Sequence, residues 1–512
     1  MMLGGIPLMG ISSRLQPGAD TIVNTASGKW RGRIDNGLHV FKGIRYGADT
    51  GPRRFLAPVS PKPWTGVRDA LEFGPVAPQP GLSDRLQGED CLHLNVWTPG
   101  LRDNAKRPVL VWFHGGAYSS GTSNELETDG ARLSRRGDVV VVTVNHRLNA
   151  FGYLHLAEFD ASLAESGNAG QLDLILALEW VRDHIAEFGG NAGNVTIFGH
   201  SGGGAKCATL MAMPKAAGLF HRVLTQSGQQ ITASRIETAT RNATSLLTAL
   251  GLDRHGIDKL RTLPMEQLVK VSRAPAYLGP VKDGRVLPRD PFDPDAPPQS
   301  ARIPMILANT RGETRTLIGR GDPSLFELTW NTLQPKLAAN SPFMGTLDRA
   351  AVIAKYREWH PEYSPADVFF AATTDSRSWR GQVIEADRRA AQPSGSVPTW
   401  VYQFDWRTPI EGGKWGAHHG LDVPFVFDNA AITPHFVGTG PEQEGLSALM
   451  SRSLIAFART GDPNTAGLPP WPAFDLTRRA TMVFDRDTRV ENDPRGRERR
   501  LFGQVPYVQP GT

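Results

Sequence analysis

Apolar runs alternate with a helix-like segment along much of the chain. Continuous runs, most of them rich in β-branched residues, predict buried strands at 109–113, 139–144, 195–198, 222–225, 305–308 and 399–404. Between the second and third runs, apolar residues recur at the spacing of one helix face over 172–188. Gly189-Gly190 follows, as glycine does after a last helical turn. Buried strands separated by helices predict a largely parallel sheet covered on both faces.

A glycine-rich turn follows the strand predicted at 195–198. It reads Gly-His-Ser-Gly-Gly over 199–203, and a helix-compatible segment follows at 205–213. A Gly-x-Ser-x-Gly turn between strand and helix holds the serine in a strained conformation with its Oγ exposed. Ligands of such sheets bind beyond the carboxyl ends of the strands, where this turn lies. The pattern predicts that Ser201 is a nucleophile.

A serine nucleophile needs a base and an acid that orients the base. In a strand-turn-helix arrangement of this kind the acid and then the histidine follow the serine in the chain. Glu313 follows the strand predicted at 305–308, and His418 and His419 follow the one at 399–404. Spacing does not choose between these histidines, and it leaves His435 open as the base and Asp422 as the acid.

A second glycine-rich segment follows the strand predicted at 109–113. It reads His-Gly-Gly-Ala over 114–117 and is similar to the His-Gly-Gly-Gly loop of esterases and lipases. Small residues let backbone N–H groups approach the oxygen that becomes negative in acyl transfer. Together with the serine turn, this segment predicts a hydrolase of acyl compounds.

Motifs across most of the chain resemble the type-B carboxylesterases, the cholinesterase-related branch of the α/β-hydrolases. They are FKGIRYG (41–47), EDCLHLNV (89–96), NHRL (145–148), GNAG (167–170), FGGN (188–191), GLF (218–220), QSG (226–228), FARTGDPN (457–464) and WP (471–472). The resemblance implies an α/β-hydrolase fold. We therefore expect a single domain over 18–506 that follows a short N-terminal extension at 1–17.

The resemblance also implies roles for particular residues. Ser201 matches the family's nucleophile, Glu313 its acid, and His419, which precedes Gly420, its base. The oxyanion donors implied are the backbone N–H groups of Gly116, Ala117 and Gly202.

Three residues depart from the family's pattern. Gly312 stands where the family has Asp, His200 where it usually has Glu, and Gly202 where it usually has Ala. His200 cannot stabilise the imidazolium as a carboxylate would, so we expect it to pack behind the triad or to contact substrate. Tyr118 and the insertion at 322–344 are further candidates for the substrate pocket.

The resemblance bears on the entrance of the pocket as well. Many relatives form a disulfide from the position of Cys91, but Ala77 occupies the partner position here. The connecting segment at 79–88 is short and polar, so we expect no long lid and an open esterase pocket rather than a lipase. Cys91 and Cys207 are the two cysteines of the chain, so a disulfide framework is excluded.

Composition excludes several other classes of protein. The chain has 512 residues, 40% of them hydrophobic, and a net charge of +5, and no apolar stretch is long enough to span a membrane. No dinucleotide or phosphate loop occurs, and the adjacent His418 and His419 lack a surrounding ligand cluster, so no cofactor and no metal are expected. The basic run of Arg495, Arg497, Arg499 and Arg500 is interpreted as a solvated surface rather than a nucleic-acid site. A cytoplasmic monomer or homodimer is expected.

The reaction expected is hydrolysis of a small-molecule carboxylic ester through an acyl-serine intermediate. The same triad chemistry serves amides, carbamates and lactones, so these are alternative substrates. A cholinesterase-like binding protein without activity is a second alternative, and it is disfavoured because every triad member and the oxyanion loop are present.

Overall fold

The computed structural model describes residues 21–82, 85–393, 396–509 and 511–512, so the predicted N-terminal extension at 1–17 lies outside the described residues. Within them the main sheet has eleven strands in the order β14-β13-β12-β11-β10-β9-β7-β8-β6-β4-β3. In chain order these are β3 (Arg33–Asp35), β4 (Leu38–Arg45), β6 (His93–Thr98), β7 (Arg107–Phe113), β8 (Val140–Val144), β9 (Gly190–His200), β10 (Arg222–Gln226), β11 (Met305–Thr310), β12 (Thr399–Phe404), β13 (Ala480–Phe484) and β14 (Arg489–Asn492). All six strands predicted from apolar runs are present.

The centre of the sheet is parallel and its edges are antiparallel. Neighbours from β8 through β7, β9, β10, β11 and β12 to β13 pair in parallel. The pairs β3·β4, β4·β6, β6·β8 and β13·β14 are antiparallel. The prediction of a largely parallel sheet is confirmed for the centre. A second, three-stranded sheet comprises β1 (Ile22–Thr25), β2 (Gly28–Arg31) and β5 (Val67–Asp69).

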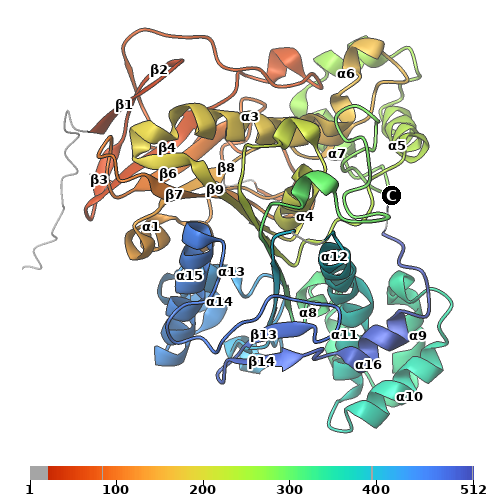
Figure 1. Ribbon diagram of the computed structural model, residues 1–512. Coiled ribbons are helices and arrows are strands. Elements are labelled where there is room, and N and C mark those ends of the chain that lie inside the picture. Colours follow the sequence, from red (N-terminus) through yellow and green to blue (C-terminus); the bar gives the residue numbers. More distant parts are fainter. Residues whose placement is uncertain (1–20, 83–84, 394–395, 510) are drawn as a thin grey trace, which may run out of the picture.

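Helices pack on both faces of the main sheet, with a hydrophobic core on each side (Figure 1). One core lies under α3 (Ala169–His184) and α4 (Gly202–Leu210). The other lies under α1 (Ala131–Gly137), α13 (Val423–Val426) and α15 (Pro441–Thr460). The helix predicted over 172–188 is α3 with the short turn η6 (Ile185–Phe188), and Gly189 ends it at a φ of 70°.

Two groups of helices lie beyond the carboxyl side of the strands and carry cores of their own. One comprises α2 (Asn149–Tyr153), α5 (Ile236–Ala249), α6 (Ile257–Thr262) and α7 (Met265–Val271). The other comprises α9 (Trp330–Asn340), α10 (Arg349–Trp359), α11 (Pro365–Thr374) and α16 (Gly496–Phe502). Between α11 and α12 (Arg380–Ala390) the helix forms one π-helical turn, η11 (Asp375–Trp379). The short helices α8 (Thr314–Leu317) and α14 (Pro434–Val437) complete the set.

The basic run on α16 is not simply a solvated surface, and that interpretation is wrong for its first member. Arg495 is 1% exposed and forms an ion pair with Asp375 at 2.6 Å. Arg499 pairs with Asp493 at 2.6 Å, and both side chains are partly buried. Arg495 therefore attaches the start of α16 to the π-helical turn, whereas Arg497 and Arg500 are exposed, as the solvated interpretation expected.

Both cysteines, Cys91 and Cys207, are buried and unpaired, so the disulfide of many relatives is absent here. Within the described residues, no helix combines the length and apolar character needed to cross a membrane.

Candidate active site

Ser201 lies in the turn between β9 and α4. Its φ of 56° and ψ of −124° are a strained backbone conformation for a residue with a side chain. A hydrogen bond to the neighbouring strand holds this conformation, because the Ser201 N–H donates to the carbonyl of Gln226 at 2.7 Å. A Cβ on Gly203 would lie 1.9 Å from the carbonyl oxygen of Phe113, so only glycine fits at that position. The predicted nucleophile elbow is present in the structure.

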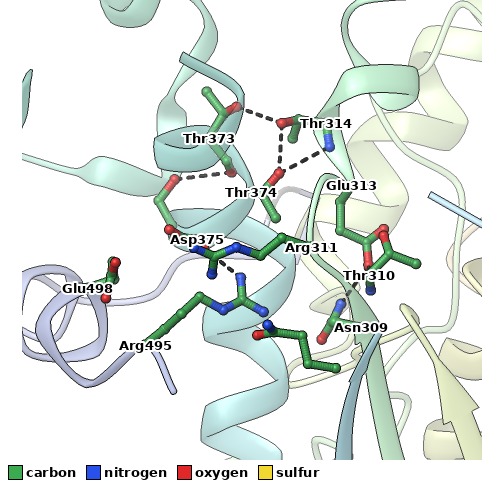
Figure 2. A network of polar contacts seen from close by, with 12 residues as sticks. Asn309, Thr310, Arg311, Glu313, Thr314, Thr373, Thr374, Asp375, Arg495 and Glu498 are labelled. Carbon is green, nitrogen blue, oxygen red and sulfur yellow. Dashed lines mark hydrogen bonds and ion pairs between the residues drawn. The ribbon is translucent and has the colours of Figure 1, made fainter. Parts of the chain in front are cut away.

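Glu313 follows β11 and is completely buried. Four groups donate hydrogen bonds to its carboxylate. They are Ser227 Oγ at 2.6 Å, Asn309 Nδ2 at 3.0 Å, the Thr310 N–H at 2.8 Å and His419 Nδ1. Figure 2 shows Asn309 and Thr310 beside Glu313 at the end of the strand.

These contacts settle the ionisation of Glu313. Burial by itself raises the pKa of a carboxyl, but His419 and the hydrogen bonds from Ser227 and Asn309 outweigh it and hold the pKa of Glu313 well below its usual value. Glu313 is therefore a carboxylate at every pH at which an esterase is assayed, and it holds His419 with Nδ1 as the proton donor.

The second ring nitrogen of His419, Nε2, is not engaged by the described part of the protein. This atom is buried and, among the described residues, has no hydrogen-bond partner. His419 and Ser201 line one cavity of about 300 Å³. An unoccupied Nε2 acceptor beside a serine is the arrangement that general-base catalysis requires.

The alternatives that spacing left open occupy other positions. His418 Nδ1 contacts the carbonyl of its neighbour His419, and its ring packs on Phe436. His435 is exposed and contacts Glu127 at 3.2 Å. Asp422 accepts from Gln226 Nε2 at 2.9 Å and from Tyr402 at 2.7 Å. Within the described residues, none of these three side chains forms a hydrogen bond to the His419 imidazole or to the Glu313 carboxylate.

The predicted oxyanion loop lies against the elbow. Gly116 and Ala117 have φ values of 85° and 52°, and within the described residues their N–H groups donate to no other group. Gly202 is the first residue of α4, where an N–H has no partner inside the helix. A Cβ on Gly202 would lie 2.0 Å from the Ala117 carbonyl oxygen, so the two backbones touch. The three predicted donors are thus brought together beside Ser201.

Lys206 on α4 forms hydrogen bonds to this loop, and the sequence did not predict this role. The side chain is completely buried on α4, and its Nζ donates to the carbonyls of His114 at 3.1 Å and Ala117 at 2.9 Å. Burial lowers the pKa of Lys206 to about 7. The hydrogen bonds fix both ends of the predicted oxyanion loop relative to α4, which begins directly after Ser201.

The cavity has two sides of different construction. We call Gly116, Ala117, Ser201 and Gly202 the elbow side, and we call Phe343, Arg377 and Tyr507 the far wall. Ala117, Ser201 and Gly202 line the cavity from the first set, and all three residues of the far wall line it. Phe343 lies in the predicted insertion at 322–344, whereas Arg377 comes from the π-helical turn and Tyr507 from the C-terminal segment.

The two candidate pocket residues lie in different places. Tyr118 lines the cavity of Ser201, and its hydroxyl donates to Gln230 Oε1 at 2.8 Å. His200 does not line that cavity. Its ring centroid lies 4.3 Å from that of His419, and both rings border a second cavity of about 370 Å³. His200 is buried and its pKa is well below the usual value for histidine, first because of burial and then because of His419.

Sequence reasoning missed four residues that complete the site. Ser227 and Asn309 hold Glu313, Lys206 holds the oxyanion loop, and Arg377 lines the cavity. A buried lysine five residues after the nucleophile was visible as a charge in an apolar helix, but the others required the folded chain. Among the described residues no group of three side chains suited to a metal ion occurs.

Comparison with known proteins identifies the family. A profile of the Carboxylesterase family matches residues 19–502. The chain belongs to the carboxylesterase family. It is 35% identical over 511 residues to the para-nitrobenzyl esterase of Bacillus subtilis, covering 94% of this chain and 98% of that protein. It is 32% identical over 502 residues to the phenmedipham hydrolase of Pseudarthrobacter oxydans, covering 92% and 97%.

Solved structures agree with the sequence comparison. A crystal structure of a Geobacillus stearothermophilus carboxylesterase superimposes with a TM-score of 0.84 at 38% identity, covering 94% of this chain and 100% of that one. The predictions of an α/β-hydrolase fold and of a type-B carboxylesterase are confirmed. This carboxylesterase is a serine hydrolase of carboxylic esters.

Proposed function

We propose that Ser201, His419 and Glu313 form the catalytic triad of this carboxylesterase. One observation carries the proposal. His419 donates from Nδ1 to the buried Glu313 and leaves its Nε2 without a partner in the cavity that Ser201 lines. Among the described residues, no other histidine both contacts a carboxylate and lines the cavity of Ser201.

The reaction proceeds through an acyl-serine. His419 Nε2 takes the proton of Ser201 as Oγ attacks the ester carbonyl carbon, and the C–O bond of the leaving alcohol breaks as His419 returns the proton to it. Water then attacks the acyl carbon with the same base and releases the acid. Glu313 stays ionised throughout, because its hydrogen bonds hold its pKa low, and it stabilises the imidazolium that forms twice in each cycle.

The backbone N–H groups of Gly116, Ala117 and Gly202 are the proposed oxyanion donors. They need no side chain and no movement of charge, since they are fixed before the substrate arrives. The Lys206 Nζ donates a hydrogen bond to the Ala117 carbonyl and so keeps the backbone of Ala117 in place. Preorganised donors of this kind lower the barrier because they are not reoriented during the reaction.

The substrate class supported best is small-molecule carboxylic esters. A cavity of about 300 Å³ is at the lower end of the range for ligand pockets. The matched family and the para-nitrobenzyl esterase are named for esters. Hydrolysis of amides, carbamates or lactones by the same triad stays an alternative prediction, as do a cytoplasmic location and a monomeric or homodimeric state.

The proposal is tested by labelling and by turnover. A fluorophosphonate probe should label the wild type and not Ser201→Ala, and Ser201→Ala should lose about 10⁵-fold or more in kcat on p-nitrophenyl acetate. Ser245→Ala is the matched control, because Ser245 is exposed and bonds only to the Arg241 carbonyl of its own helix. Labelling of Ser201→Ala at the wild-type rate would show that the nucleophile is elsewhere.

A further inference from the structure

The cavity of Ser201 carries a single charged side chain that has no opposite charge beside it. Of the described residues that line the cavity, Arg377 is the only arginine, lysine, aspartate or glutamate. Its guanidinium contacts Ser378 Oγ at 3.4 Å and lies 5.8 Å from the centre of the Phe343 ring. No carboxylate of the described chain pairs with it, although most of the buried arginines elsewhere in the protein have such a partner.

The next arginine along the helix adds to the positive charge. The Arg380 guanidinium lies 5.6 Å from the centre of the Tyr507 ring and donates to the backbone carbonyls of Phe343 and Val505. Carbonyl groups satisfy its N–H groups but do not cancel its charge. Two guanidinium groups therefore lie against aromatic rings of the far wall, Arg377 against Phe343 and Arg380 against Tyr507, and of the two arginines only Arg377 lines the cavity.

Two carboxyl groups of the same helical region, Asp375 and Glu385, do not neutralise these arginines. Asp375 lies in the same π-helical turn as Arg377, but it is held by Arg495 at 2.6 Å and by the Tyr356 hydroxyl at 2.6 Å. Figure 2 shows Asp375 beside Arg495 and Arg311.

Glu385 on α12 is the second carboxyl group near this wall, and it is uncharged at neutral pH. Burial raises its pKa to about 8, against the hydrogen bond that it accepts from the Gln230 N–H at 2.8 Å. The far wall is therefore positive at neutral pH, within the cavity in which the ester is cleaved.

We propose that Arg377 binds a carboxylate of the substrate, so that the preferred esters carry a free carboxylate at the end remote from the ester bond. The inference rests on the proposed function, because it assigns the substrate class of the cavity that Ser201 lines. An unpaired guanidinium recognises a carboxylate through two parallel N–H···O bonds. The bound carboxylate takes no part in bond making, so the atoms exchanged in hydrolysis are unchanged.

The test compares two esters of one chain length. The p-nitrophenyl monoester of adipic acid ends in a carboxylate, and the p-nitrophenyl ester of monomethyl adipate ends in a neutral methyl ester. The quantity measured is the ratio of kcat/KM for the charged ester to that for the neutral one, in the wild type, Arg377→Met and Arg377→Lys. Arg357→Met is the matched control, because Arg357 is exposed on α10 and lies over Trp330.

We expect the ratio to fall about ten-fold in Arg377→Met, since a hydrogen-bonded charge pair is lost from a partly buried site. Arg377→Lys should keep part of the ratio, Arg357→Met all of it, and added salt should lower the wild-type ratio. An unchanged ratio in Arg377→Met would overturn the inference while both esters are still cleaved. Loss of cleavage of both esters by the wild type, without labelling of Ser201, would instead overturn the proposed function.

Discussion

The elbow side of the cavity is built mainly from backbone, whereas the far wall is built from side chains of segments that are distant in sequence. On the elbow side, Gly202 lies so close to Ala117 that a Cβ would be 2.0 Å from its carbonyl oxygen. On the far wall, Phe343, Arg377 and Tyr507 come from three segments that are distant in sequence. The elbow side is fixed by close contacts, and the proposed chemistry takes place there. The proposed role of the far wall is to select the substrate, so substitutions on the two sides should affect different kinetic constants.

The largest effect is expected at Glu313, which contacts His419, the proposed base for Ser201 on the elbow side. Glu313→Gln should lower kcat about 10³- to 10⁴-fold, because an amide cannot stabilise the imidazolium and favours the wrong tautomer of His419. The measurement is kcat on p-nitrophenyl acetate, with thermal unfolding as a check of the fold. Glu127→Gln, which removes the exposed contact to His435, should leave kcat at the wild-type value. A loss below ten-fold would refute the assignment of the acid.

The next largest effect is expected from a substitution at Gly202, which tests the close contact between Gly202 and Ala117. Gly202→Ala restores the residue that the family usually has, yet we expect about a 100-fold loss of kcat, because the new methyl group displaces the Ala117 peptide and its N–H donor. Gly445→Ala on α15 is the control, since a Cβ there meets nothing within 4 Å. Full activity of Gly202→Ala would mean that the loop moves freely and is not set by this contact.

Lys206 should have a smaller effect on the same side. Lys206→Met removes both hydrogen bonds to the oxyanion loop, and we expect kcat to fall about ten-fold with little change in KM. Lys206→Gln, which retains a donor, should recover part of the loss. Lys215→Met is the control, because that lysine is exposed and pairs with Glu165 on the surface. A change in KM alone would place the role of Lys206 in substrate binding.

Lys206 also predicts a dependence of stability on pH. Burial lowers its pKa to about 7 in the folded state, while the unfolded lysine keeps its proton to about 10.4. Between these values the unfolded state binds one more proton, so raising the pH favours the folded state. The melting temperature of the wild type relative to Lys206→Met should therefore rise from pH 7 to pH 10. A constant difference would show that Lys206 stays charged.

The smallest effect is expected on the far wall, and on a different constant. Tyr507→Ala should raise KM for neutral esters about five-fold and change kcat little, because it removes apolar contact area that is equal in ground and transition states. Val508→Ala is the control, since Val508 is 65% exposed. A large loss of kcat with KM unchanged would mean that the far wall positions the triad, and the contrast between the two sides would fail.

Local sequence determined much of the elbow side. The strand, the elbow glycines and the Gly-Gly loop each need neighbours only a few residues away, so apolar period and turn chemistry were enough to predict Ser201 and the parallel centre of the sheet. The triad's acid and base were implied only by resemblance, because Glu313 and His419 meet across β11 and β12, and spacing left His418, His435 and Asp422 open.

Tertiary structure decided the far wall and the supports of the triad. Ser227 reaches Glu313 only because β10 and β11 lie side by side, whereas Asn309 is at the end of β11, four residues before Glu313. The charge of Arg495 looked solvated in sequence, but it is buried against Asp375 from a helix more than a hundred residues earlier, and this pairing leaves Arg377 without a partner. Which charges are paired depends on contacts distant in the chain. The sequence alone therefore determined the type of reaction, and only the tertiary structure indicated which substrates the cavity would accept.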